Sequence, residues 1–280
     1  VRLQVTRTPK TAGIQPSGSE RGSETIENIE RRQVGREESI VPEVNMSTER
    51  PHCVVVGIGP GTGAACARRF SNEGYKVSII SRSDERLAEF HAEIPHTMPY
   101  RADLKDSEAY REILERIVAE HGVPQVVVHN ATQATFGRYD EIDMEKFQRN
   151  FAVNAGGLLV TAQVFGPKMV ERGGGAIIVT GNTAATRGKP NFVGWAPTKA
   201  AQRILAEALA RELGPSGVHV AYVIIDAAID MPFARRRRGE KPDDFFAKPD
   251  DLAGEIYHVA HQPRSSWSFL VELRPFGEIW

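Results

Sequence analysis

The sequence predicts a doubly wound α/β domain built on a parallel sheet of about seven strands. From residue 51 onward, short apolar runs alternate with helical patterns of ten or more residues, and a glycine-rich turn joins the first run to the first helix. This alternation implies right-handed crossovers, which cover both faces of the sheet with helices. No composition shift after residue 51 marks a second domain, so we expect a single one.

The elements can be assigned in chain order. Apolar runs predict strands at residues 52–59, 76–81, 97–102, 125–130, 175–182, 218–225 and 268–274. Helical patterns lie at residues 63–74, 84–93, 107–122, about 144–172 and 196–213. In the third helix Tyr110, Leu114 and Ile117 fall on one apolar stripe, and Gly214-Pro215 stops the last helix.

Residues 1–48 are a different kind of sequence. They are rich in Ser, Glu, Arg and Gly and poor in aromatic residues, so they cannot bury enough apolar surface to offset the entropy of ordering. We expect a disordered polar N-terminal extension at 1–48 and the folded domain at 49–280. Met46, just before the first strand, is a candidate translation start, which would make the extension an artefact; the alternative is a genuine disordered tail.

Composition narrows the class of protein. The formal net charge of −1 and the 41% hydrophobic content fit a soluble globular protein and leave no basic excess for nucleic acid. No apolar run approaches the roughly eighteen residues that a membrane helix needs. Cys53 and Cys66 form no C-x-x-C pair, and no histidine shows metal-ligand spacing, so we expect reduced core thiols, no metal and a cytoplasmic protein.

The glycine-rich turn carries the clearest chemistry. The segment VVVGIGPGTGAACARRF places four glycines and a threonine between the first strand and its helix: Gly57, Gly59, Gly61, Thr62 and Gly63. Glycines there permit a tight turn and a close backbone approach to a pyrophosphate at the helix N-terminus. In this strand–turn–helix context the turn predicts a dinucleotide-binding Rossmann fold rather than a merely flexible loop.

The end of the second strand bears on the choice of dinucleotide. Ser81 and Arg82 stand where an NAD-preferring site has a carboxylate for the ribose 2′-hydroxyl. An arginine there can bind a 2′-phosphate bidentately, so NADP(H) is predicted and NAD(H) remains the alternative. The competing interpretation of Arg82 is a solvated arginine at a helix start.

With these features together, residues from about 52 to 274 resemble the short-chain dehydrogenase/reductase family. The glycine spacing matches that of the family, with Val56 where a threonine is usual. The segment ADLKD is similar to the acidic motif after the third strand, which implies that Asp103 and Leu104 lie near the adenine. Asn130 and Ala131 match the family's N-N-A-G.

The resemblance extends to the central helix but breaks at the catalytic positions. Asn154 in FAVNAGG matches the family's active-site asparagine, and Lys199 matches the lysine of its Tyr-x-x-x-Lys. Asn182 stands at the serine position, Trp195 at the tyrosine position, and Ile225-Asp226 at the Pro-Gly after the sixth strand. The pattern is similar to a divergent subgroup in which an aromatic residue replaces the tyrosine.

The resemblance implies hydride transfer between a nicotinamide and a small-molecule carbonyl or alcohol. An indole N–H donates hydrogen bonds but does not ionise near neutral pH, so the usual proton donor is missing. Three interpretations stay open. Lys199 anchors the ribose while water, Thr183, Thr198 or Tyr139 supplies the proton; Lys199 itself is the acid; or the site binds NADP(H) without turnover, as a pseudoenzyme that senses or scaffolds.

Two further features concern partners. The family makes dimers through its central helix, so resemblance implies a homodimer or homotetramer. The run Arg235–Arg238 lies where family members carry a lid over the substrate. It could recruit an anionic substrate, but a solvated charge run, offset by nearby acids, is the favoured interpretation.

Overall fold

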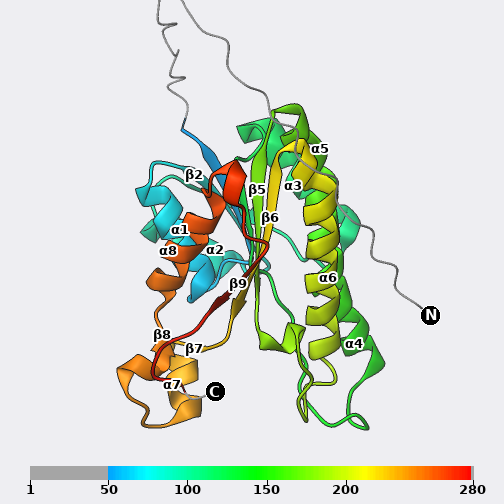
Figure 1. The fold of residues 1–280 in the computed structure, drawn as a ribbon, viewed down its shortest axis with the longest axis vertical. Coiled ribbons are helices and arrows are strands. Elements are labelled where there is room, and N and C mark those ends of the chain that lie inside the picture. The colour runs from blue at the N-terminus through cyan, green and yellow to red at the C-terminus, as the bar shows by residue number, and fades with distance from the viewer. Residues whose placement is uncertain (1–49, 279–280) are drawn as a thin grey trace, which may run out of the picture. The chain divides into compact units, whose positions relative to one another are not determined.

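The computed structural model describes residues 50–278, and the predicted extension, Met46 included, lies outside them. Seven parallel strands form one sheet in the order β3-β2-β1-β4-β5-β6-β9, which confirms the predicted fold class (Figure 1). The strands are β1 His52–Val56, β2 Lys76–Ser81, β3 Thr97–Arg101, β4 Val126–His129, β5 Gly175–Gly181, β6 Val218–Ile225 and β9 Leu270–Leu273. Each of them falls within a predicted run.

Helices cover both faces of this sheet (Figure 1). They are α1 Thr62–Asn72, α2 Asp84–Glu93, α3 Ser107–His121, α4 Met144–Phe151, α5 Gly157–Glu171, α6 Ala196–Leu213, α7 Pro232–Arg238 and α8 Pro249–Ala260. One apolar core packs α1, α2 and α8 against the sheet, and a second core packs α3, α5 and α6 against its other face. The helix predicted at 196–213 has those bounds, while the region predicted at 144–172 is α4, a π-helical turn at Ala152–Gly156, and α5.

Helix α8 was absent from the sequence prediction. It begins with Pro249 in its first turn, next to Asp250 and Asp251, whose charges favour a helix N-terminus. Leu252 and Ile256, four residues apart, face the core and are buried. The helix pattern was therefore present in the sequence, but it directly follows a segment rich in charged residues.

That charged segment, residues 226–248, is called the lid here. It contains α7 and two short strands, β7 Ala228–Ile229 and β8 Phe246–Ala247, which pair in parallel. The carboxylate of Asp230 accepts hydrogen bonds from Arg235 at 2.5 and 2.9 Å and from Lys248 at 2.6 Å. These ion pairs connect the parts of the lid to one another. They also hold the pKa of Asp230 well below its usual range.

The carboxyl ends of the strands meet at one edge of the sheet. The chain order reverses between β1 and β4, and a crevice at such a switch point is the usual ligand site of a doubly wound sheet. Within residues 50–278, no helix combines the length and the apolarity that a membrane crossing would need.

Two buried histidines make this fold acid-sensitive. Burial lowers the pKa of His52 to about 4 and that of His129 to about 3. Both are neutral when folded, so an unfolded chain binds more protons below about pH 6.5. Stability should therefore fall as the pH drops from about 6.5 toward 4, by roughly 1.4 kcal/mol per pH unit for each histidine.

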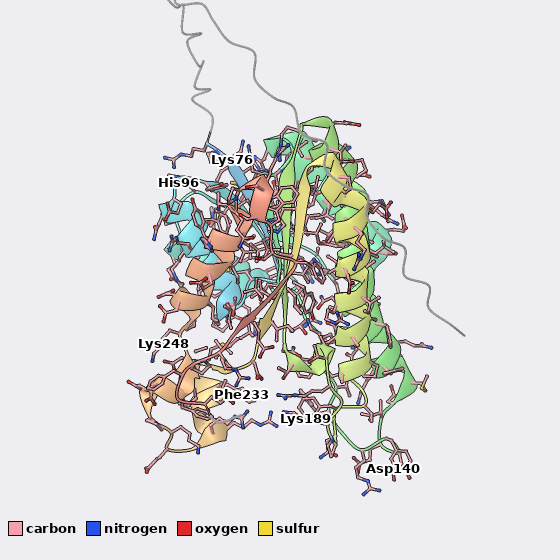
Figure 2. All side chains as sticks on the ribbon, in the orientation of Figure 1. Lys76, His96, Asp140, Lys189, Phe233 and Lys248 are labelled. Carbon is pink, nitrogen blue, oxygen red and sulfur yellow. The ribbon has the colours of Figure 1, made fainter. Side chains whose placement is uncertain are left out.

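Urea unfolding at several pH values tests this expectation. Replacing His129 with asparagine should remove the part of the acid-induced loss of stability that this histidine causes. The same change at His96, an exposed histidine (Figure 2), should leave the loss as it is in the parent protein. Equal acid-induced losses in the parent and in His129→Asn would contradict the assignment.

Candidate active site

The glycine turn leaves no room for side chains at two of its positions. Gly57 has φ of +88°, and an added Cβ would lie 2.5 Å from the Cα of Ala131. A Cβ on Gly63 would lie 2.7 Å from the carbonyl oxygen of Gly57. At Gly59, in contrast, a Cβ would meet no protein atom within 4 Å. Packing thus explains why residues 57 and 63 are glycines. Packing does not require a glycine at position 59, which lies on the wall of the cavity described next.

The first turn of α1 has no capping side chain, and its Ala64 N–H donates to the Gly59 carbonyl at 2.9 Å. Gly61 supplies no side-chain cap and no acidic residue stands in the first turn. The hydroxyl of Thr62 is buried and has no hydrogen-bond partner among the residues that the structure describes. A buried polar group without a partner is costly, so this helix end fits an anionic ligand. Met231 of the lid lies against Gly61, 2.6 Å from where its Cβ would be.

A cavity of about 330 Å³ joins this turn to the ends of β2, β3 and β4. The predicted cofactor residues on its wall are Gly57, Gly59, Gly61, Thr62, Gly63, Ser81, Arg82, Asp103, Leu104, Asn130 and Ala131. The sequence prediction missed further lining residues: Ile58, Pro60, Ile80, Arg86, Ala102, Thr132, Val153, Ile229 and Met231. Lys199 is not in this lining.

Two arginines stand where β2 leads into α2. Arg82 is exposed and donates to the side-chain oxygen of Gln133 at 3.3 Å. Arg86, one helical turn further, lines both the cavity and an adjoining hollow formed with Ser81 and Glu89. Arg82 precedes the N-cap of α2, so helical spacing did not single out Arg86. Glu85 and Glu89 line the same hollow as the two arginines.

Asn130 braces the glycine turn. Its Nδ2 donates to the carbonyl oxygen of Gly57 at 2.8 Å, and its Oδ1 accepts from the hydroxyl of Thr180 on β5 at 2.9 Å. These two bonds tie the ends of β1, β4 and β5 together. The side chain therefore positions the turn, and its polar atoms are already used.

Asn154 lies in the π-helical turn between α4 and α5 and is fully buried. Its Nδ2 donates to the Gln133 carbonyl at 2.8 Å and to the Thr198 hydroxyl at 2.7 Å, while its Oδ1 accepts from the Gln133 N–H at 2.9 Å. A π-helical turn inside a helix often marks a functional site. Through these bonds the Asn154 side chain joins the loop after β4 to the start of α6.

Trp195 stands at the start of α6 with a buried indole N–H. No described residue accepts a hydrogen bond from this Nε1 atom. Its ring contacts Phe136, with centroids 5.1 Å apart, and Phe192, with centroids 5.8 Å apart. The indole is thus held by an aromatic cluster and offers one unused donor.

Lys199 follows one helical turn after Trp195 and is almost completely buried, at 2% exposure. Its Nζ donates to the carbonyl oxygen of Thr180 at 3.2 Å and to the side-chain oxygen of Gln202. Burial lowers the pKa of Lys199 to about 7, because the ammonium loses its water. Burial therefore disfavours the charged form of this lysine.

The other candidate groups are placed as follows. Asn182 accepts from the Ala184 N–H at 2.9 Å and so caps a short 3₁₀ turn. Thr198 is fully buried, donates to the Trp195 carbonyl at 2.7 Å, and accepts from Asn154. Tyr139 is 79% exposed, next to Asp140 on a loop that reaches away from the sheet (Figure 2). Thr183 follows Asn182 and is half-buried.

The lid arginines divide into two kinds. Arg235 binds Asp230 and, at 2.8 Å, Asp243, so it is engaged inside the lid and is not free to recruit a substrate. Arg236–Arg238 are exposed. Asp226, at the family's glycine position, forms ion pairs with Arg274 and, at 3.6 Å, with Arg187. This tethers the end of β6 to two other segments.

Comparison with known proteins agrees with this geometry. The family described as short chain dehydrogenase matches residues 51–238. The chain therefore belongs to the short-chain dehydrogenase family. Among solved structures, it is similar to the alcohol dehydrogenase from the archaeon Thermococcus sibiricus complexed with 5-hydroxy-NADP. The likeness has 26% identity and a TM-score of 0.73, and it covers 82% of this chain and 99% of that one.

Curated relatives carry oxidoreductase names. The chain is 32% identical over 240 residues to "Probable oxidoreductase EphD" of Mycobacterium tuberculosis, covering 84% of this chain but 39% of that protein. It thus spans about two fifths of the length of that relative. It is 27% identical to "Carbonyl reductase [NADPH] 2" of Sus scrofa, covering 77% of this chain and 91% of that protein.

The contrast between glycines gives a test of the cavity. Gly59→Ala should leave the melting temperature unchanged, because its Cβ meets no protein atom, yet weaken NADPH binding roughly tenfold or more by filling space at the turn. The measurement is a fluorescence titration beside a thermal melt. Gly214→Ala, whose Cβ also meets nothing within 4 Å, is the matched control and should bind normally. Unchanged affinity in Gly59→Ala would place the dinucleotide elsewhere.

Proposed function

We propose that this protein is an NADP(H)-dependent oxidoreductase that transfers a hydride between the nicotinamide and a small carbonyl or alcohol substrate. The observation that carries the proposal is the cavity at the switch point, with an open glycine turn and an unpartnered Thr62 hydroxyl at the helix N-terminus. The family membership and the oxidoreductase names of relatives support it. Because this chain covers only 39% of the Mycobacterium tuberculosis relative, the activity and substrates of that longer protein are not assigned to it.

The residues of the cavity fit NADP(H) in a definite orientation. The glycine turn and Thr62 would hold the pyrophosphate, and Asp103 and Leu104 would lie beside the adenine. Arg82 and Arg86 would bind a 2′-phosphate, since both line the cavity at the end of β2 and no carboxylate ends that strand. These two arginines support the proposal of NADP(H) over NAD(H).

The chain's own residues then have separate roles. The chemistry that bound NADP(H) supplies is donation or acceptance of a hydride. The free indole N–H of Trp195 would donate to the carbonyl oxygen and stabilise the negative charge that develops there. Asn154 would hold the loop after β4 and the start of α6 in place through its three hydrogen bonds.

The proton would come from Lys199. Thr198 already donates to a backbone carbonyl, and Tyr139 is exposed on an outlying loop, so neither hydroxyl is a good donor. Lys199 is buried and titrates near neutral pH. Carbonyl reduction would need the ammonium and should slow as the pH rises past about 7, whereas alcohol oxidation would need the free amine and should accelerate over the same range.

A pseudoenzyme is the second candidate. The feature that favours it is the use of Asn182 as a turn cap, together with the ion pairs of Asp226, which leave neither side chain free for a substrate. Such a protein would bind NADP(H) and act through a partner.

We also propose a homodimer or homotetramer, supported by Leu159 on α5 and Ile204 on α6, which are 41% and 53% exposed.

Cofactor preference is tested by titrating the full chain with NADPH and with NADH. NADPH should bind more tightly, and Arg82→Ala should weaken NADPH roughly ten- to hundredfold, the value of a charge-assisted hydrogen bond, while leaving NADH nearly unchanged. Arg68→Ala, on the exposed side of α1, is the control. Equal losses for both cofactors in Arg82→Ala would refute a 2′-phosphate contact.

Two substitutions at Trp195 separate the enzyme from the pseudoenzyme. Trp195→Tyr restores an ionisable hydroxyl and should raise carbonyl reduction by about 10²–10⁴-fold. Trp195→Phe keeps an aromatic ring but removes the N–H, and should lower any activity by roughly 10²-fold. Steady-state rates with a panel of aldehydes and ketones measure both. If the parent and both variants bind NADPH but reduce nothing, the pseudoenzyme is the better description.

A further inference from the structure

A polar cluster lies buried between α6 and the sheet, on the inner side of Lys199. Gln202, fully buried and one turn after the lysine, accepts the Lys199 ammonium on its Oε1. The hydroxyl of Tyr222 on β6 donates to the same oxygen at 3.4 Å. Two donors from different elements thus converge on one amide oxygen, which fixes the orientation of the amide.

The backbone is shaped to hold this cluster. Tyr222 is fully buried, and a Cβ on Gly181 would lie 2.4 Å or less from its ring and hydroxyl atoms. The tyrosine can therefore lie over β5 only because residue 181 has no side chain. The carbonyl of Thr180, the residue before it, supplies the other acceptor of Lys199.

The buried titratable groups on the strands near the ammonium are neutral, while Arg203, on α6 itself, is a cation that acts on Tyr222 and pairs with Glu207. His129 on β4 and Tyr222 on β6 are the buried titratable groups there, and burial keeps both uncharged at neutral pH, because it lowers the pKa of His129 and raises that of Tyr222. Strand β5 and the π-helical turn carry no titratable residue.

The remaining charges lie at the surface. Glu145, Lys146 and Arg149 on α4 are exposed, and the charged residues of α5, Lys168 and Glu171, lie in its last turn. Within the described part of the chain, no carboxylate pairs with Lys199.

The amide of Gln202 is also incompletely satisfied. Its Nε2 atom is buried and has no hydrogen-bond partner among residues 50–278. An unsatisfied buried donor costs stability, and leucine would fill the position without that cost. The presence of an amide at position 202 is therefore explained by the two hydrogen bonds that its oxygen accepts, chiefly the one from Lys199, and not by packing.

We propose that Gln202 is a positioning residue that anchors the Lys199 ammonium through a neutral oxygen and keeps it without a counter-charge. This inference rests on the proposed role of Lys199 as the proton donor. A glutamate at position 202 would pair with the ammonium and hold its proton firmly. A leucine would remove the acceptor and make the charged form less favourable still.

The first test is the pH profile of carbonyl reduction by the full chain and by two variants. Gln202→Glu should move the midpoint of the profile upward by roughly one to two pH units, the effect of an opposite charge within hydrogen-bond reach. Gln202→Leu should move it downward. Gln163→Glu makes the same chemical change on the exposed side of α5 and should leave the midpoint in place. A purely structural role would lower rates without moving the midpoint in opposite directions.

A second readout does not depend on activity. Because the pKa of Lys199 is about 7 in the folded chain and about 10.4 in an unfolded one, the unfolded chain binds more protons between these values. The urea midpoint of the parent should therefore rise with pH over this range, relative to Lys199→Met. In Gln202→Glu the rise should begin at a higher pH.

The outcomes are distinguishable. If no carbonyl is reduced but the unfolding profiles shift as stated, the oxidoreductase proposal fails and the role of Gln202 stands. If both Gln202 variants keep the pH midpoint of the parent in the profiles of rate and of unfolding, the inference is overturned, whatever the activity.

Discussion

The close approach of three backbone segments at the carboxyl edge of the sheet is the constraint on which the site depends. Gly57 can contact Ala131, and Gly63 can contact the Gly57 carbonyl, only because neither glycine carries a Cβ. Asn130 then locks this contact by bonding both Gly57 and Thr180. A side chain at either glycine would force one of these close neighbours to shift, so the turn keeps this shape only with glycine at both positions.

The same edge contains the unusual chemistry of the chain. Lys199 is bonded to Thr180, the strand residue that also holds Asn130, so the lysine and the glycine turn are mechanically linked through β5. Burial without a carboxylate costs stability, since the ammonium loses water and gains only neutral acceptors. The same loss of water lowers the pKa of Lys199, so its ammonium gives up a proton more readily than an exposed lysine does. The burial of Lys199 beside neutral acceptors is the observation behind its proposed role as the proton donor.

The lid is held by a different kind of interaction. Asp230 gathers Arg235 and Lys248 near the protein surface, where each ion pair contributes little by itself because water screens it. The network nevertheless fixes where Met231 meets the glycine turn, on one wall of the cavity. The apolar cores thus lie on the two faces of the sheet, and the lid that reaches this wall of the cavity is held by ion pairs that salt screens.

The sequence by itself determined the strands, most helices and the glycine turn, because hydrophobic periodicity and glycine spacing are local properties that a single segment carries. It also singled out Lys199 and Trp195 as candidate site residues through the resemblance to the family, and their roles stay predictions. It did not indicate that Lys199 and Tyr222 converge on the side-chain oxygen of Gln202, or that Met231 reaches Gly61, since the contacts of Tyr222 and Met231 join residues far apart in the chain. The burial that lowers the pKa of Lys199 likewise emerged only with the tertiary structure. Burial is a property of what packs around a side chain, and no single segment encodes it.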